Sequence, residues 1–166
     1  TEKKDEVARQ VGLGSLKYAM LARDNNKMVI FDLEEALSFE GHSAPYIQYA
    51  HARACRIIEH SGMDEAAIAA AAQSVDFGSL PPQELSLLQA IAAFPAEIER
   101  AAAEYRPLLI ASYVFELAKT FNDFYHACPV LSSEEPVRTA RIVLVSATRQ
   151  VLANALALLQ IDAPAE

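Results

Sequence analysis

The chain has 166 residues, of which 52% are hydrophobic, so it fits one domain with a substantial core, or one domain plus part of a neighbour. No apolar run reaches the roughly 18 residues of a membrane span, and the charged start has no signal-peptide core, so neither a membrane nor a secreted protein is indicated. The net charge of −8 lies mainly in residues 62–105, which hold seven acids and one basic residue, so it neither predicts nor excludes a nucleic-acid partner.

The first forty residues predict short elements. Thr1 can cap a helix over residues 2–10, and Gly12 and Gly14 are expected to interrupt it before a second short helix begins at Leu16. Residues 28–31 (MVIF) are the one convincing strand-like run. Asp32 is then expected to cap a helical turn that ends near Leu37.

From residue 41 onward the sequence predicts helices separated by proline and glycine. Ser43 and Pro45 indicate the start of a helix that runs to about His60 and ends at Gly62. Further helices are expected over residues 64–74, 82–93, 95–105, 107–127 and 137–160. The fold class is therefore all-α, an antiparallel helix bundle from about residue 62 on, preceded by a piece with at most one short strand.

One helix carries aromatic and basic residues on a single stripe. Tyr46, Tyr49 and Arg53 are spaced i, i+3 and i+7, so they share a helical face. Two phenol rings and a guanidinium can stack on unpaired bases and hold a phosphate. The alternative, which the pattern alone favours, is that both tyrosines pack on a neighbouring helix while Arg53 pairs with an acid.

The last two predicted helices offer further candidates. Arg138, Arg141 and Arg149 fall within about 80° of one another around the last helix. They form either a phosphate-facing stripe or a solvated face opposite the apolar one. Near the end of the preceding helix Tyr125 is a candidate for stacking on a base, whereas its neighbours Phe121 and Phe124 are expected in the core.

Motifs for catalysis or metal binding are missing from this sequence. The four histidines are scattered without an HExxH spacing, no GxSxG elbow is present, and Gly12-Leu13-Gly14 is not followed by a phosphate-loop pattern. Cys55 and Cys128 are far apart and lack a CxxC context, which favours packing roles in a reducing, cytosolic compartment. The chain alone is therefore predicted to be inactive and to hold no metal.

Several spaced blocks resemble the arginyl-tRNA synthetase family. The first third contributes residues 11–18 (VGLGSLKY), 31–41 (FDLEEALSFEG) and 45–53 (PYIQYAHAR). The remainder contributes residues 106–118, 121–125 (FNDFY), 147–152 (ATRQVL) and 158–161 (LLQI). The resemblance spans essentially the whole chain.

The resemblance implies the C-terminal part of a class I synthetase that attaches arginine to its tRNA with ATP and usually Mg²⁺. The signatures that handle ATP are absent here, so residues 1–40 are expected to be the end of the catalytic domain and a connecting segment. Residues 41–166 would form the helical, DALR-type anticodon-binding domain, with no cofactor of its own.

The partners implied are the anticodon stem-loop of arginine tRNA and the missing catalytic domain of the same chain, in the cytoplasm, with no membrane and no DNA. In this family the helix that carries Tyr46, Tyr49 and Arg53 helps to hold the anticodon stem-loop, and Tyr125 also matches. The alternative reading is a helical protein-interaction domain with no RNA role, supported by the acidic middle of the chain.

Overall fold

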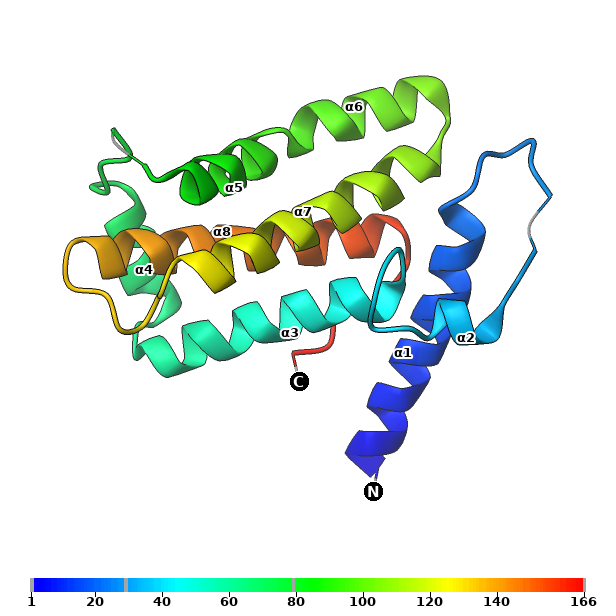
Figure 1. The fold of residues 1–166 in the computed structure, drawn as a ribbon, viewed down its shortest axis with the longest axis horizontal. Helices are drawn as coiled ribbons and strands as arrows, with labels where there is room; N and C mark the ends of the chain where they lie inside the picture. Colours follow the sequence, from blue (N-terminus) through cyan, green and yellow to red (C-terminus); the bar gives the residue numbers. More distant parts are fainter. Residues whose placement is uncertain (1, 29, 79, 166) are drawn as a thin grey trace.

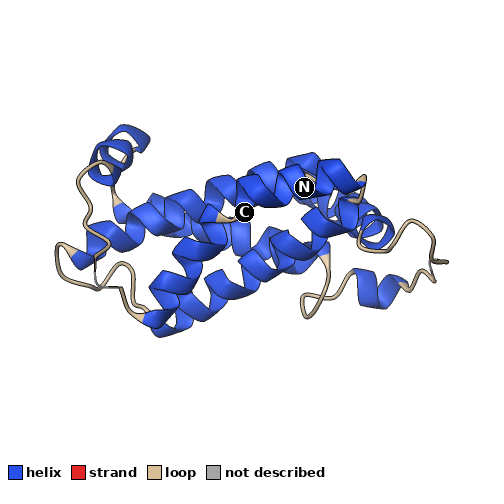
Figure 2. Ribbon diagram, turned by 90° about the horizontal axis from the view of Figure 1, so that it is seen from above, coloured by secondary structure: helices blue, strands red, loops and turns tan. Residues whose placement is uncertain are grey.

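The computed structural model describes residues 2–28, 30–78 and 80–165, and within these residues it is all helix and loop (Figures 1 and 2). Eight helices follow one another along the described chain: α1 (Glu2–Leu21), α2 (Leu33–Ala36), α3 (Ala44–Ser61), α4 (Glu65–Ala72), α5 (Pro82–Ala92), α6 (Phe94–Glu104), α7 (Pro107–Ala127) and α8 (Val137–Leu158). The all-α prediction is confirmed.

The core lies where α8 packs against α3, α4, α5 and α7. Helices α3, α7 and α8 run alongside one another, and α5 and α6 follow each other along the outer side of α7 (Figure 1). The apolar face of α8 is fully buried at Ile142, Val145, Leu152 and Leu156. Helix α3 packs on both α7 and α8, so the expectation of a bundle beginning near residue 62 was wrong: it begins with α3.

By length and composition alone helix α8 could cross a membrane, although polar residues interrupt its apolar sequence. Its burial gives a different reason for this composition. It is the central helix of the bundle, so apolar residues meet neighbouring helices over much of its circumference.

Helix α1 is continuous, and the expected interruption at Gly12 and Gly14 was wrong. A glycine inside a helix costs about 1 kcal/mol relative to alanine, and tertiary packing outweighs that penalty here. A Cβ at Gly14 would lie 2.9 Å from Gln48 Nε2 and 3.1 Å from Ile161 Cγ2. The glycine therefore serves the close approach of α1 to α3 and to the segment after α8.

The strand expected over residues 28–31 is wrong for the described residues. Met28, Ile30 and Phe31 lie in an irregular loop with exposed side chains, and Val29 lies outside the described residues. An extended run forms a stable strand only when a neighbouring strand completes its hydrogen-bond ladder. The described part of the chain offers no such neighbour.

The helix boundaries follow the local signals. Asp32 accepts hydrogen bonds from the Glu34 and Glu35 amides at 2.8 and 3.0 Å, and Ser43 caps α3. Gly62 ends α3 with φ of 73°, a left-handed conformation that favours glycine. Pro95 lies in the first turn of α6, where the chain breaks from α5 as expected.

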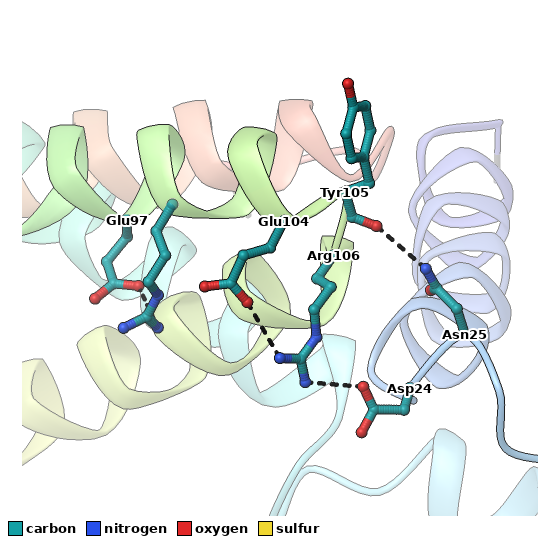
Figure 3. Close-up of polar contacts among 7 residues, drawn as sticks. Asp24, Asn25, Glu97, Glu104, Tyr105 and Arg106 are labelled. Atoms are coloured by element: carbon teal, nitrogen blue, oxygen red, sulfur yellow. Dashed lines mark hydrogen bonds and ion pairs between the residues drawn. The ribbon is translucent and has the colours of Figure 1, made fainter.

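Polar contacts attach the turn after α1 to the corner between α6 and α7 (Figure 3). The Arg106 guanidinium lies 2.8 Å from Asp24 Oδ1 and 3.2 Å from Glu104 Oε2, and the hydrogen bond to Asp24 is the main cause that raises the Arg106 pKa. Asn25 Nδ2 donates to the Tyr105 carbonyl at 3.1 Å. These contacts fix the N-terminal segment to the bundle. The division into a catalytic remainder over residues 1–40 and an anticodon-binding domain over residues 41–166 stays a prediction.

Candidate nucleic-acid interface

The predicted stripe on α3 separates into an inward and an outward part. Tyr46 is partly buried, and its ring lies 5.4 Å from that of Phe115 on α7. Tyr49 is 53% exposed. Positions 46 and 49 differ by about 60° around the helix, which is enough to place one ring against α7 and the other at the surface. The packing alternative therefore describes Tyr46 and not Tyr49.

Arg53 lies between two tyrosine rings that come from different helices. Its Cζ is 4.7 Å from the ring centroid of Tyr49 on α3 and 4.7 Å from that of Tyr125 on α7. Both distances fall within the range of cation–π attraction. Its Nη1 also donates to Asn122 Oδ1 at 2.6 Å. The alternative in which Arg53 pairs with an acid is wrong, because its side-chain partner is a neutral amide.

The three arginines of α8 are each engaged with another part of the protein. Arg138 donates to the Ser61 carbonyl at 2.7 Å and pairs with Glu135 at 3.4 Å. Arg141 pairs with Glu84 of α5, and Arg149 pairs with Glu65 of α4. These contacts join α8 to its neighbours. A role of these arginines in tRNA binding stays a prediction.

Charge distinguishes Arg53 from those three. Among the described residues, no carboxylate lies within ion-pair distance of Arg53. Six other arginines pair with a carboxylate, whereas Arg53 shares the lack of one with Arg23 and Arg56 in the described part of the chain. A guanidinium without a nearby carboxylate attracts anions such as phosphate.

An open groove of about 460 Å³ runs beside the cluster. Its lining includes Tyr49, Arg53 and Tyr125, together with Arg56, His60 and Leu131, and it contains no acidic residue. Tyr125 is 40% exposed. The groove thus combines basic groups with two accessible aromatic rings, a composition suited to single-stranded nucleic acid.

The opposite face of α3 binds the segment that follows α8. Gln48 is buried, and its Nε2 donates to the Asp162 carbonyl at 2.9 Å. His51 is also buried, with Nδ1 2.9 Å from the Pro164 carbonyl. Burial is the main cause that lowers the His51 pKa. This face holds α3 in place, which leaves the other face to the groove.

The two cysteines are shielded by their surroundings. Burial raises the pKa of both the Cys55 and the Cys128 thiols, which favours their unreactive protonated forms. No group of three His, Cys, Asp or Glu side chains suited to a metal is found among the described residues.

Sequence reasoning missed Asn122. A signal was present, because Asn122 precedes Tyr125 by three positions and therefore shares its helical face. The sequence does not indicate that this face of α7 meets Arg53.

Comparison with known proteins shows the family of the chain. Residues 47–166 match the family model of the DALR anticodon binding domain. The chain is 44% identical over 163 residues to the arginine–tRNA ligase of Pyrococcus abyssi, covering 98% of this chain and 26% of that protein. It is 42% identical over 161 residues to that of Haloarcula marismortui, covering 96% of this chain and 27% of that protein.

Solved structures show the same fold. An arginyl-tRNA synthetase of Thermus thermophilus superposes with a TM-score of 0.88 at 36% identity, over 98% of this chain and 27% of that chain. One from Plasmodium falciparum gives a TM-score of 0.85 at 22% identity, over 98% and 28% of the two chains, which supports the fold alone. The chain spans about a quarter of the length of these relatives. The resemblance to arginyl-tRNA synthetases is confirmed.

Proposed function

Because the chain belongs to the DALR anticodon binding domain family, we propose that it is the tRNA-binding part of an arginine–tRNA ligase and that it holds the anticodon stem-loop at the groove beside Arg53. The observation that carries the proposal is the uncompensated guanidinium of Arg53 between the rings of Tyr49 and Tyr125.

Each part of the cluster suits an unpaired RNA loop. With Nη1 held by Asn122, the other N–H groups of Arg53 remain to donate to a phosphate oxygen. Tyr49 and Tyr125 are 53% and 40% exposed, so both rings have surface on which a base can stack. Tyr46 packs on Phe115 of α7, and Arg138, Arg141 and Arg149 contact neighbouring parts of the bundle.

The partners follow from the relatives. Arginine tRNA is the expected RNA, and the catalytic domain is expected elsewhere in a longer cytoplasmic protein of which this chain is about a quarter. We propose that ATP and Mg²⁺, which the arginylation reaction uses, bind in that remaining part of the longer protein and not in this chain. Arginylation would therefore take place in the remainder of that protein.

A binding titration tests the proposal. The chain and its Tyr49→Ala and Arg53→Ala variants are titrated into fluorescein-labelled arginine tRNA at several salt concentrations. Loss of a stacking platform is worth about 1–3 kcal/mol, so Tyr49→Ala should weaken binding about 5- to 150-fold. Arg53→Ala should also lower the salt dependence of log Kd by about 0.7, the contribution of one phosphate contact on a single strand.

Tyr105→Ala is the matched control. Tyr105 is 84% exposed at the corner between α6 and α7 and takes no part in the cluster, so its removal should leave the affinity unchanged. Equal affinities for the wild-type chain and both test variants would reject the site. Absence of any salt-dependent tRNA binding would favour a protein-interaction domain instead.

A further inference from the structure

Asn122 is the side chain that fixes Arg53 without neutralising it. We propose that Asn122 is a positioning residue for RNA binding: its neutral amide oxygen orients the Arg53 guanidinium between the two tyrosines and leaves the positive charge available to a phosphate. The inference rests on the proposed function of the groove and identifies the side chain that orients Arg53 before RNA binds.

Three contacts restrain the guanidinium. The ring of Tyr49 comes from one turn earlier on α3, the ring of Tyr125 comes from α7, and Asn122 Oδ1 accepts from Nη1 at 2.6 Å. An arginine side chain loses much rotamer freedom when it is held in one position. Since that loss is incurred on folding, it does not have to be incurred again when RNA binds.

The other arginines show what distinguishes this arrangement. Those with an ion pair are held by carboxylates of the same or another element: Arg9 by Glu6, Arg100 by Glu97, Arg106 by Asp24, Arg138 by Glu135, Arg141 by Glu84 and Arg149 by Glu65. A carboxylate makes the stronger, charge-assisted hydrogen bond. Arg53 instead donates to the neutral amide oxygen of Asn122, which makes a weaker hydrogen bond.

The choice of acceptor has an electrostatic consequence. A carboxylate at position 122 would hold Arg53 at least as firmly, but its negative charge would cancel the field that attracts a phosphate. An amide gives the orientation alone. In a protein whose net charge is −8, asparagine at position 122 therefore orients Arg53 without adding a further negative charge beside it.

Two substitutions separate orientation from charge. In Asn122→Ala the guanidinium keeps its charge and loses its restraint, so tRNA affinity should fall about 3- to 10-fold while the salt dependence stays unchanged. In Asn122→Asp an ion pair with Arg53 should keep the melting temperature at or above that of the wild type. Affinity should nevertheless fall at least about tenfold, and the salt dependence should decrease by about 0.7.

A double-mutant cycle gives the decisive readout. If Asn122 acts through Arg53, Asn122→Ala should cost nothing further in the Arg53→Ala background. Asn154→Ala and Asn154→Asp serve as controls, because Asn154 is exposed on α8 and its side chain accepts a hydrogen bond from Gln150 of the same helix, away from the cluster. Circular-dichroism melting of every variant monitors folding.

The possible results are distinct. An equal loss on Asn122→Ala in the wild-type and Arg53→Ala backgrounds overturns the positioning role. Full affinity and salt dependence in Asn122→Asp overturns the role of neutrality. If Arg53→Ala binds tRNA with unchanged affinity, the proposed function of the groove is wrong, and this inference is wrong with it. If Arg53→Ala binds tRNA more weakly while Asn122→Ala keeps the wild-type affinity, only this inference is wrong.

Discussion

The ion pair between Glu84 and Arg141 gives the strongest stability prediction. Glu84 Oε1 lies 2.7 Å from Arg141 Nε, and the two side chains are 4% and 13% exposed. Glu84→Ala would leave a nearly buried guanidinium without its counter-charge, a change that costs about 3–5 kcal/mol in comparable pairs. Arg141 would retain the Pro129 carbonyl and Ser133 Oγ, both at 2.7 Å, so we expect a loss near the lower limit, about 3 kcal/mol.

The loss is measurable as a shift in thermal and chemical unfolding. With about 2.1 cal/mol/K of unfolding entropy per residue, a loss of about 3 kcal/mol lowers the melting temperature of a chain of this size by about 9 °C. Urea titration should show a lower midpoint with an unchanged m-value.

A second variant tests the cause. Replacing both partners, in Glu84→Leu with Arg141→Met, removes the charge and its need for a partner together, so stability should return close to that of the wild type. A melting temperature lowered by less than about 3 °C in Glu84→Ala, or a double variant as unstable as the single one, would refute the reasoning.

Three further predictions concern the core and the pH dependence of stability. Phe121 is fully buried, so Phe121→Ala should lower the unfolding free energy by about 3–5 kcal/mol in urea titration, and a loss below about 1 kcal/mol would contradict its core position. Tyr18→Phe removes the 3.0 Å hydrogen bond from the buried hydroxyl to the Ala111 carbonyl and should cost about 1 kcal/mol in the same assay. His51 has a folded-state pKa below its ordinary value of 6.5 because it is buried. As the pH falls through that value the unfolded chain takes up the proton first, so the unfolding free energy should decrease from pH 7.5 to 5.5, and this decrease should be smaller in His51→Gln. Identical pH profiles for both proteins would show that His51 is not responsible.

Local sequence signals determined most of the secondary structure. Asp32, Ser43 and Asp64 accept hydrogen bonds from amides of the first helical turn, and prolines lie in the first turn of α5, α6 and α7, so each boundary depends on atoms within one turn of it. The same locality explains the errors. Judged from the residues next to it in the sequence, Gly14 is expected to interrupt a helix. Its packing role depends on Gln48 and Ile161, which approach it from distant parts of the chain.

The candidate site divides in the same way. The spacing of Tyr49 and Arg53 along α3 follows from the sequence, because residues four apart on a helix are neighbours whatever surrounds them. The sequence does not determine how α3, α5, α7 and α8 are rotated against one another. These rotations bring Tyr125 and Asn122 to Arg53, and they bring Glu84 to Arg141. Side-chain packing across the whole core sets those rotations, so only the tertiary structure decided that Arg53, unlike Arg141, keeps its charge for a ligand.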